Sequence, residues 1–309
     1  MVRRLGERIA SSPLSAVLAV VLAMLFSLAL PPLSSVLVYV AAAALALHTL
    51  QAGALSGARV LGISMAGLAG MVTLALDSGL ASPLALVLLL LWVPVWLGAW
   101  VLRQTRSLAL ALLVLSGLGM VLVLLVYAIW GDPRAWWPGW VAQQLATAAE
   151  LQPELQDSVG SMQEFARRLA PVLAGTLALS LVLNAVLCLS LGRWWQAVAL
   201  QRTGAVREEF RRLRLNRGLS LAGLAVWGLA SVDLGIVSVV ALQWALVIMV
   251  PFMFIGLAVA HVVLAGRPAG LALLLLVYLV AAVAPQLLAA LGLVDPWLDP
   301  RRRFGAGRG

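Results

Sequence analysis

Nine apolar stretches of helix length run through this sequence, and they constrain its fold more than any other feature. They cover residues 14–30, 33–50, 60–76, 84–102, 108–130, 171–191, 219–232, 236–265 and 269–291. The hydrocarbon core of a bilayer, about 30 Å thick, needs roughly 20 apolar residues per helix, and most stretches come close to that length. A membrane β-barrel would instead show alternating segments of about ten residues. We therefore expect an all-α fold, a polytopic transmembrane helical bundle.

The composition agrees with a membrane location. Hydrophobic residues make up 63% of the chain and charged residues only 11%, whereas a soluble domain carries about 25% charged residues. All the basic residues are arginines, and the net charge is +9. A basic patch on a folded domain would indicate nucleic-acid binding, but these arginines stand in short gaps between apolar stretches. They indicate topology, so the lipid bilayer is the expected partner and nucleic acid is not.

The arginines predict the orientation of the chain, because short cytoplasmic loops carry an excess of positive charge. They gather in alternate gaps, at Arg3, Arg4 and Arg8, at Arg59, at Arg103 and Arg106, and in the segment 193–217. This alternation predicts a cytoplasmic N-terminus and places the segment 131–170 outside. We expect a multi-pass protein of the bacterial inner (cytoplasmic) membrane.

The number of crossings depends on the C-terminal part. Nine crossings would leave the arginines of the tail on the outer side, against the same rule, so one stretch is expected not to cross. The stretch 219–232 is the candidate, because it is short and contains Gly223 and Gly228. If it is re-entrant, the chain has eight membrane helices and both termini are cytoplasmic. Nine membrane helices is the alternative.

The single membrane domain, residues 1–309, divides into six segments. They are a first helical group (14–130), an outer interfacial segment (131–170), a helix (171–191), a basic cytoplasmic segment (193–217), a last helical group (219–291) and a basic tail (292–309). The outer segment and the basic segment are long enough to form interfacial amphipathic helices.

The basic cytoplasmic segment combines an apolar stripe with positive charge. Val206, Phe210 and Leu213 follow helical spacing, which is typical of a basic helix that lies against an anionic leaflet. The residues predicted to contact lipid or a partner are Arg207, Arg211, Arg212 and Arg214.

Three tryptophans suggest where a ligand could bind. Trp92, Trp96 and Trp100 are spaced at i, i+4 and i+8, so their rings share one face of a helix. Such a face can wall a pocket for a flat ligand, or it can face lipid or a neighbouring helix. Polar side chains within bilayer segments are costly and are therefore further candidates. The predicted ligand contacts are Trp92, Trp96, Trp100, Asn184, Gln243 and His261.

Most sequence patterns of enzymes are missing. The chain has no H-E-x-x-H motif, and its two histidines and one cysteine fall short of an ordinary metal site. Ser64 and His261 have the elements of a rhomboid-like dyad, but a serine among small residues of a membrane helix usually serves packing. We predict no catalytic residue, no metal and no cofactor.

The last quarter of the chain carries a resemblance to a known family. Residues 256–261, Tyr278 and above all the terminal stretch 292–303, with its pattern Gly-Leu-x-Asp-x-Trp-x-Asp-x-Arg, resemble the closing segment of the YybS-like family of predicted bacterial membrane proteins, which has no established activity. The resemblance implies distant kinship with the substrate-binding subunits of energy-coupling-factor vitamin transporters, and so implies membrane or ATPase partner subunits. Those subunits dock their partner through an Ala-x-x-x-Ala face of the first helix, and Ala19 and Ala23 match that spacing.

These observations favour one function over two others. The leading prediction is a non-enzymatic membrane protein that binds or passes a small, partly apolar solute. The alternative is a membrane scaffold that recruits a partner through its basic cytoplasmic segment. An intramembrane hydrolase is the third hypothesis.

Overall fold

A computed structural model describes residues 2–75, 81–152, 154, 156–265 and 267–304. These residues form helices joined by short connections, without a strand among them, so the all-α prediction is confirmed. The helices of the first half are α1 (Val2–Ser11), α2 (Pro13–Ala29), η1 (Pro31–Leu33), α3 (Ser34–Ala52), α4 (Ala54–Ala75), α5 (Ala81–Thr105) and α6 (Leu108–Trp130). Those of the second half are α7 (Pro133–Leu151), α8 (Gln156–Leu169), η4 (Ala170–Val172), α9 (Leu173–Ala199), α10 (Thr203–Arg211), α11 (Arg217–Ala230), α12 (Ile236–Val263), α13 (Gly270–Val283), α14 (Pro285–Leu298) and α15 (Pro300–Phe304).

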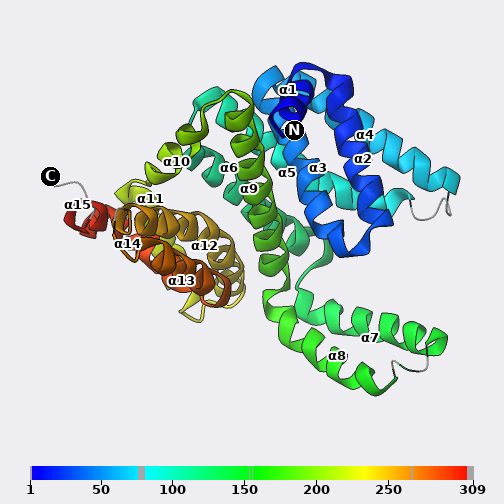
Figure 1. The fold of residues 1–309 in the computed structure, drawn as a ribbon. Helices are drawn as coiled ribbons and strands as arrows, with labels where there is room; N and C mark the ends of the chain where they lie inside the picture. Colours follow the sequence, from blue (N-terminus) through cyan, green and yellow to red (C-terminus); the bar gives the residue numbers. More distant parts are fainter. Residues whose placement is uncertain (1, 76–80, 153, 155, 266, 305–309) are drawn as a thin grey trace.

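The long helix α9 lies at the centre of the molecule (Figure 1). It packs against α1, α3 and α5 on one side and against α6 and α12 on the other. Its contact with α3 is close because small residues meet there: a Cβ added at Gly192 would lie 2.7 Å from the Cβ of Ala46. Alanine and glycine therefore let α9 join an N-terminal group of helices to a C-terminal group.

The segment predicted to lie outside, residues 131–170, contains a helical hairpin. Helices α7 and α8 pack against each other and extend away from the rest of the molecule (Figure 1). Asp132 caps the N-terminus of α7 by accepting a hydrogen bond from the backbone N–H of Arg134, and Pro133 occupies the first helical turn, a position that needs no donor.

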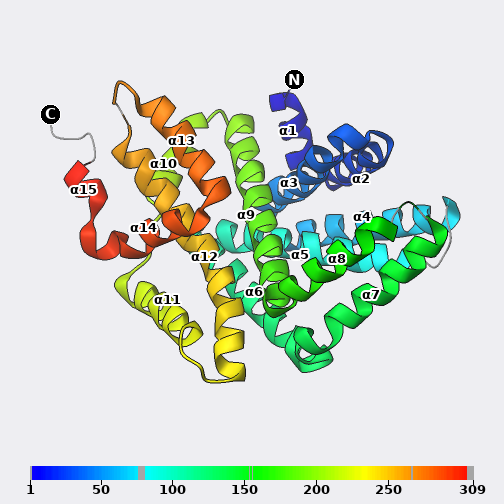
Figure 2. The same ribbon diagram turned by 90° about the horizontal axis from the view of Figure 1, so that it is seen from below.

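The C-terminal group contains a sharp break. The continuous apolar stretch 269–291 predicts one helix there, but the structure has two. Helices α13 and α14 meet at Ala284 with a bend of 108°. The break lies at Pro285, because proline restricts the residue before it to extended backbone. Figure 2 shows α14 crossing beside α12 and leading to α15. The chain therefore changes direction inside its last apolar stretch.

Helix α14 packs tightly on α12 through two glycines. A Cβ at Gly256 would overlap the backbone carbonyl of Leu288, and a Cβ at Gly292 would overlap the backbone carbonyl of Phe252. Glycine at both positions allows the two backbones to touch, as small residues do at membrane helix interfaces.

Six helices of the described residues are long and apolar enough to cross a membrane, or seven if the bent pair α13–α14 is one span. The six are α3, α4, α5, α6, α12 and the continuous helical stretch that contains α9. Helices α2 and α11 are apolar but shorter, with 17 and 14 residues. The structure thus shows a protein with several apolar helices of membrane-spanning length.

Candidate functional site

An apolar cavity of about 780 Å³ lies between α9, α10, α12 and α13. Its walls are mainly aliphatic side chains, such as Leu183 and Leu187 of α9, Met253 and Leu257 of α12, and Ala281 of α13. These residues recur at four-residue intervals on α9 and on α12, so each helix turns one continuous stripe into the cavity. The cavity is therefore a product of helix packing, and its interior favours apolar groups.

Polar groups gather at one corner of this cavity. His261 Nδ1 lies 2.9 Å from the backbone oxygen of Leu257, and His261 Nε2 lies 3.4 Å from the hydroxyl of Tyr278. A carbonyl only accepts, so neutral His261 carries its proton on Nδ1 and leaves Nε2 as an acceptor. The contact with Tyr278 is long for a hydrogen bond. The corner thus offers an acceptor nitrogen and a phenol to a polar group inside an apolar space.

Helix α10 covers the cavity with its apolar face. Phe210 packs edge-on against Phe254, with ring centroids 6.5 Å apart, and against His261 at 5.4 Å. Val206, one turn earlier, also lines the cavity. The predicted apolar stripe of the basic segment therefore faces protein, and Leu213 at its end is buried.

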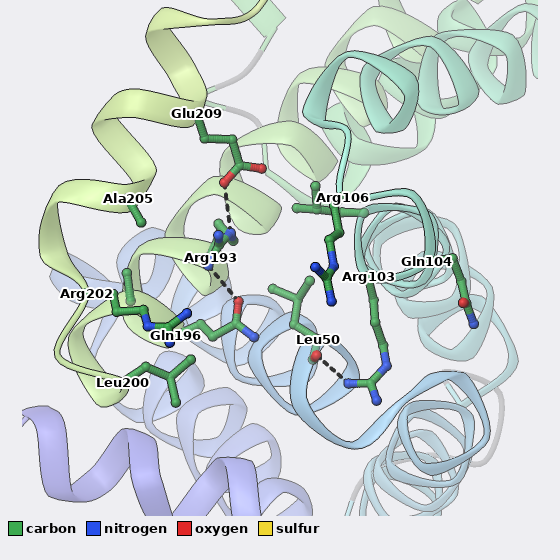
Figure 3. Close-up of a pocket in the computed structure, with 12 residues that line it drawn as sticks. Leu50, Arg103, Gln104, Arg106, Arg193, Gln196, Leu200, Arg202, Ala205 and Glu209 are labelled. Atoms are coloured by element: carbon green, nitrogen blue, oxygen red, sulfur yellow. Dashed lines mark hydrogen bonds and ion pairs between the residues drawn. The ribbon is translucent and has the colours of Figure 1, made fainter.

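A second cavity, of about 530 Å³, has the opposite character. It lies where the ends of α5 and α9 meet the start of α10, and Figure 3 shows the arginines that surround it. Arg193 donates to Glu209 at 3.0 Å and to the side-chain oxygen of Gln196 at 2.9 Å. Glu209 also lines the apolar cavity, so the two cavities adjoin this residue.

The predicted tryptophan stripe does not line a described cavity. Trp92 is fully buried, and its indole N–H has no hydrogen-bond partner among the described residues. Trp96 donates to the backbone oxygen of Ala54 at 3.0 Å and stacks on Trp100, with ring centroids 6.1 Å apart. The stripe therefore shares one face, as its spacing predicts, and the described contacts of that face are with protein.

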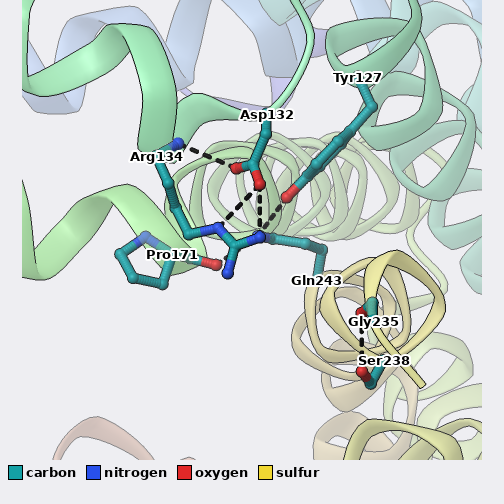
Figure 4. A network of polar contacts seen from close by, with 7 residues as sticks. All are labelled: Tyr127, Asp132, Arg134, Pro171, Gly235, Ser238 and Gln243. Carbon is teal, nitrogen blue, oxygen red and sulfur yellow. Dashed lines mark hydrogen bonds and ion pairs between the residues drawn. The ribbon is translucent and has the colours of Figure 1, made fainter. Parts of the chain in front are cut away.

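Gln243 is enclosed by protein contacts. Its side-chain oxygen accepts from the backbone N–H of Gly175 at 2.6 Å, and its amide nitrogen donates to the backbone oxygen of Pro171 at 2.6 Å and to the hydroxyl of Tyr127 at 3.2 Å. Figure 4 shows Gln243 beside Tyr127 of α6 and Pro171 of η4. Gln243 therefore satisfies a backbone N–H in the first turn of α9, a group that a helix leaves without an internal partner.

Of the two remaining residues predicted to contact a ligand, one lines the apolar cavity and the other does not. His261 lines the apolar cavity, whereas Asn184 does not and instead accepts a weak hydrogen bond from Cys188, with 3.7 Å between Sγ and Oδ1. The structure thus brings His261 to a cavity but does not bring it together with Gln243, Asn184 or the tryptophans. Ser64 lies on α4, which packs against α2, α3 and α5, while His261 lies on α12 and contacts Tyr278. The two residues do not form the dyad.

The four arginines predicted to contact lipid or a partner have different surroundings. Arg207 lines the apolar cavity and Arg211 donates to the backbone oxygen of His261 at 3.4 Å. Arg212 pairs with Glu208 one turn away on α10, and Arg214 pairs with Asp299 at 2.9 Å. Three of the four side chains, those of Arg207, Arg212 and Arg214, belong to exposed residues.

Sequence reasoning missed several residues of these cavities. Tyr278 makes the polar corner with His261, Phe210 packs edge-on against His261, and Arg106 and Arg202 line the basic cavity. The one signal in the sequence was the presence of Tyr278 in the part of the chain that carries the family resemblance. The sequence indicated Phe210 only as part of an apolar stripe and Arg106 only as a topology signal, and it gave no separate role to Arg202. Their roles in the cavities depend on partners that lie on distant helices.

The described residues bring no group of three His, Cys, Asp or Glu side chains close enough to hold a metal ion. No family model, no curated protein and no solved structure matches this chain.

Proposed function

We propose that this chain is a multi-pass protein of the bacterial inner membrane that binds a small, partly apolar solute, as a binding or transport-related protein. The observation that carries the proposal is the apolar cavity between α9, α10, α12 and α13. Its volume of about 780 Å³ falls in the range of small-molecule sites, roughly 300–1,000 Å³, which are also largely apolar with a few placed polar groups.

The arrangement of the cavity suggests how a solute would lie. An apolar body would contact the aliphatic walls of α9 and α12, and a polar group would reach Nε2 of His261 or the hydroxyl of Tyr278. Arg207, at the edge of the cavity, would attract an acidic group. The proposal therefore replaces the tryptophan stripe as the predicted site and retains His261.

The proposed topology has eight crossings, with α13 and α14 as the re-entrant part in place of the stretch 219–232. Arg267, before α13, donates to the backbone oxygen of Phe304, after α14, at 3.3 Å, so both ends of this pair lie on one side. Arg211 likewise contacts His261 across the pair α11–α12, so the ends of that pair also lie on one side. Because α12, with 28 residues, is long enough to span a bilayer by itself, we assign two crossings to this pair. Both termini are then cytoplasmic, in keeping with the arginine rule.

A ligand screen with cavity variants tests the function. Purified protein in a mild detergent is screened for thermal shifts with a panel of vitamins and other metabolites, and compounds that raise the melting temperature are titrated. Ala281→Phe places a ring in the cavity and should abolish the shift. Ala272→Phe is the matched control, because Ala272 is an exposed residue of the same helix that does not line the cavity.

Two results would contradict the proposed function. One is a panel in which no compound stabilises the wild type. The other is a compound that stabilises Ala281→Phe as strongly as the wild type, because its site would then lie elsewhere.

The exposed arginines of the basic segment support a second candidate function, a scaffold for a cytoplasmic or ATPase partner. The Arg212 side chain is 78% exposed and the Arg214 side chain 51%, so both can meet a partner despite their ion pairs. Replacing Arg207, Arg212 and Arg214 by glutamine should abolish crosslinking to that partner and leave solute binding intact. The resemblance to YybS-like proteins, with the partner subunits that it implies, is part of this second proposal. Ala23, one of the two alanines of the expected docking face, is buried inside the bundle, so the exposed arginines are the better candidates for a contact with a partner.

A further inference from the structure

The basic cavity concentrates positive charge beyond what its internal contacts use. Four arginines line it, Arg103, Arg106, Arg193 and Arg202, against a single acid, Glu209 (Figure 3). They come from the end of α5, the α5–α6 connection, α9 and the residue before α10. Like charges that converge from these four places repel one another, and a bound anion relieves that repulsion.

Two of the arginines already have protein partners. Arg103 donates to the backbone oxygens of Leu50, at 2.6 Å, and Gln51, which satisfies free carbonyls at the C-terminal end of α3. Arg193 donates to Glu209 and Gln196. These contacts hold the two guanidinium groups in place along the wall of the cavity.

The other two arginines, Arg106 and Arg202, have guanidinium groups without a hydrogen-bond partner in the part of the chain that the structure describes. Arg106, the first residue after α5, has a positive φ of 53°, in the left-handed region that costs a non-glycine residue about 1–2 kcal/mol. Its guanidinium points toward the space between α5 and α9 in Figure 3. Ten N–H donors of the two side chains are thus available to a ligand.

We propose that the basic cavity binds a phosphate group, carried either by an anionic lipid headgroup or by a soluble phosphate compound. Planar guanidinium groups match phosphate oxygens in pairs, and such charge-assisted hydrogen bonds are the strong ones. The cavity, about 530 Å³, has room for more than one phosphate group. This cavity adjoins the proposed solute cavity at Glu209, but the proposal does not depend on the ligand of that cavity.

The test measures phosphate binding with matched variants. Inorganic pyrophosphate is titrated calorimetrically into the purified full chain in a nonionic detergent. In a second arm, nanodiscs of phosphatidylcholine with and without phosphatidylglycerol are exchanged, and the lipid retained by the protein is counted by mass spectrometry. The cavity variant is Arg106→Gln with Arg202→Gln. The control is Arg302→Gln with Arg303→Gln, which removes the same charge from exposed residues outside the cavity.

We expect the cavity variant to weaken binding at least tenfold, since each charge-assisted hydrogen bond contributes about that factor, while the control changes it less than threefold. Glu209→Gln removes the single acid and should strengthen binding, a gain that misfolding cannot mimic. If these three effects are seen with pyrophosphate, the ligand is a soluble phosphate compound. If they are seen with phosphatidylglycerol and not with pyrophosphate, the ligand is a lipid. The proposal is overturned if neither probe binds, if the control loses as much as the cavity variant, or if Glu209→Gln does not bind more tightly. Should the cavity variant not fold, Glu209→Gln decides.

Discussion

Arg301 and Asp295 form a buried ion pair, with 3.1 Å between Nη2 and Oδ2 and side-chain exposures of only 5% and 3%. Arg301 also donates to the backbone oxygens of Arg211 and Leu213, each at 2.6 Å. Burial lowers the pKa of Arg301, and the nearby Asp295 carboxylate opposes this. The groups to which the guanidinium donates, the Asp295 carboxylate and two backbone oxygens of the basic segment, tie the C-terminal helix α15 to the end of that segment.

We predict that Arg301→Met lowers the free energy of unfolding by about 3–5 kcal/mol, because it leaves the carboxylate of Asp295 buried without a partner. Thermal melting in detergent measures the loss. Arg302→Met is the control, since Arg302 is exposed and should melt like the wild type. The double variant Arg301→Met with Asp295→Leu should recover part of the loss. A double variant less stable than Arg301→Met would contradict this account.

Cysteine labelling tests the topology. The native Cys188 is buried and can be replaced by alanine. In that background, Asp233→Cys in the α11–α12 connection should react with a membrane-impermeant maleimide added outside the cell. Arg302→Cys should react only in inside-out vesicles. Labelling of Arg302→Cys from outside would show that the last stretch crosses, as in the nine-helix alternative.

Gly292→Ala should destabilise the protein by about 1–3 kcal/mol or more, the range for overpacked interiors. The added Cβ would overlap the carbonyl of Phe252 and force α14 away from α12. Gly228→Ala on α11 is the matched control, because nothing lies within 4 Å of a Cβ there. Alanine favours helix more than glycine does, so this control should melt at or above the wild-type temperature. Equal melting of the two variants would refute the tight packing of α14.

The stability of the outer hairpin should depend on pH through Asp132. Its pKa is lowered from the ordinary 3.8, chiefly by the hydrogen bond from the Arg134 guanidinium. A lowered folded-state pKa stabilises the fold at pH above 3.8, and this contribution is lost as pH falls through the lowered value. Asp132→Asn should therefore melt below the wild type at neutral pH and approach it in acid. In an Arg134→Gln background the pH-dependent difference should be much smaller. If the pH-dependent difference in melting temperature persists in that background, it comes from a titrating group other than the Asp132–Arg134 pair.

Local sequence patterns predicted the helices well. Each of the nine apolar stretches contains a helix, and the spacing of Val206 and Phe210 correctly placed an amphipathic helix in the basic segment. Hydrophobic length and helical periodicity are properties of consecutive residues. The break at Pro285 was the exception, because the apolar stretch continues across it and hides the change of direction.

The cavities could not be predicted in the same way. The apolar one is lined by residues from Leu108 to Pro285, most of which are ordinary aliphatic side chains that acquire a role only through their neighbours. His261 was identified because a polar residue within an apolar stretch is conspicuous. Trp92 and Trp96 share a face, as their spacing requires, but the helix opposite that face decides whether it meets protein or open space.

Composition and short-range periodicity were enough to predict that this protein is helical, where its helices lie, and that several of them are apolar and of membrane-spanning length. The bend between α13 and α14 and the contact of Arg301 with the backbone of Arg211 and Leu213 came from the three-dimensional fold alone. The fold also shows which arginine side chains lack a hydrogen-bond partner among the described residues. These properties depend on contacts between residues many positions apart, and packing alone selects which distant side chains meet.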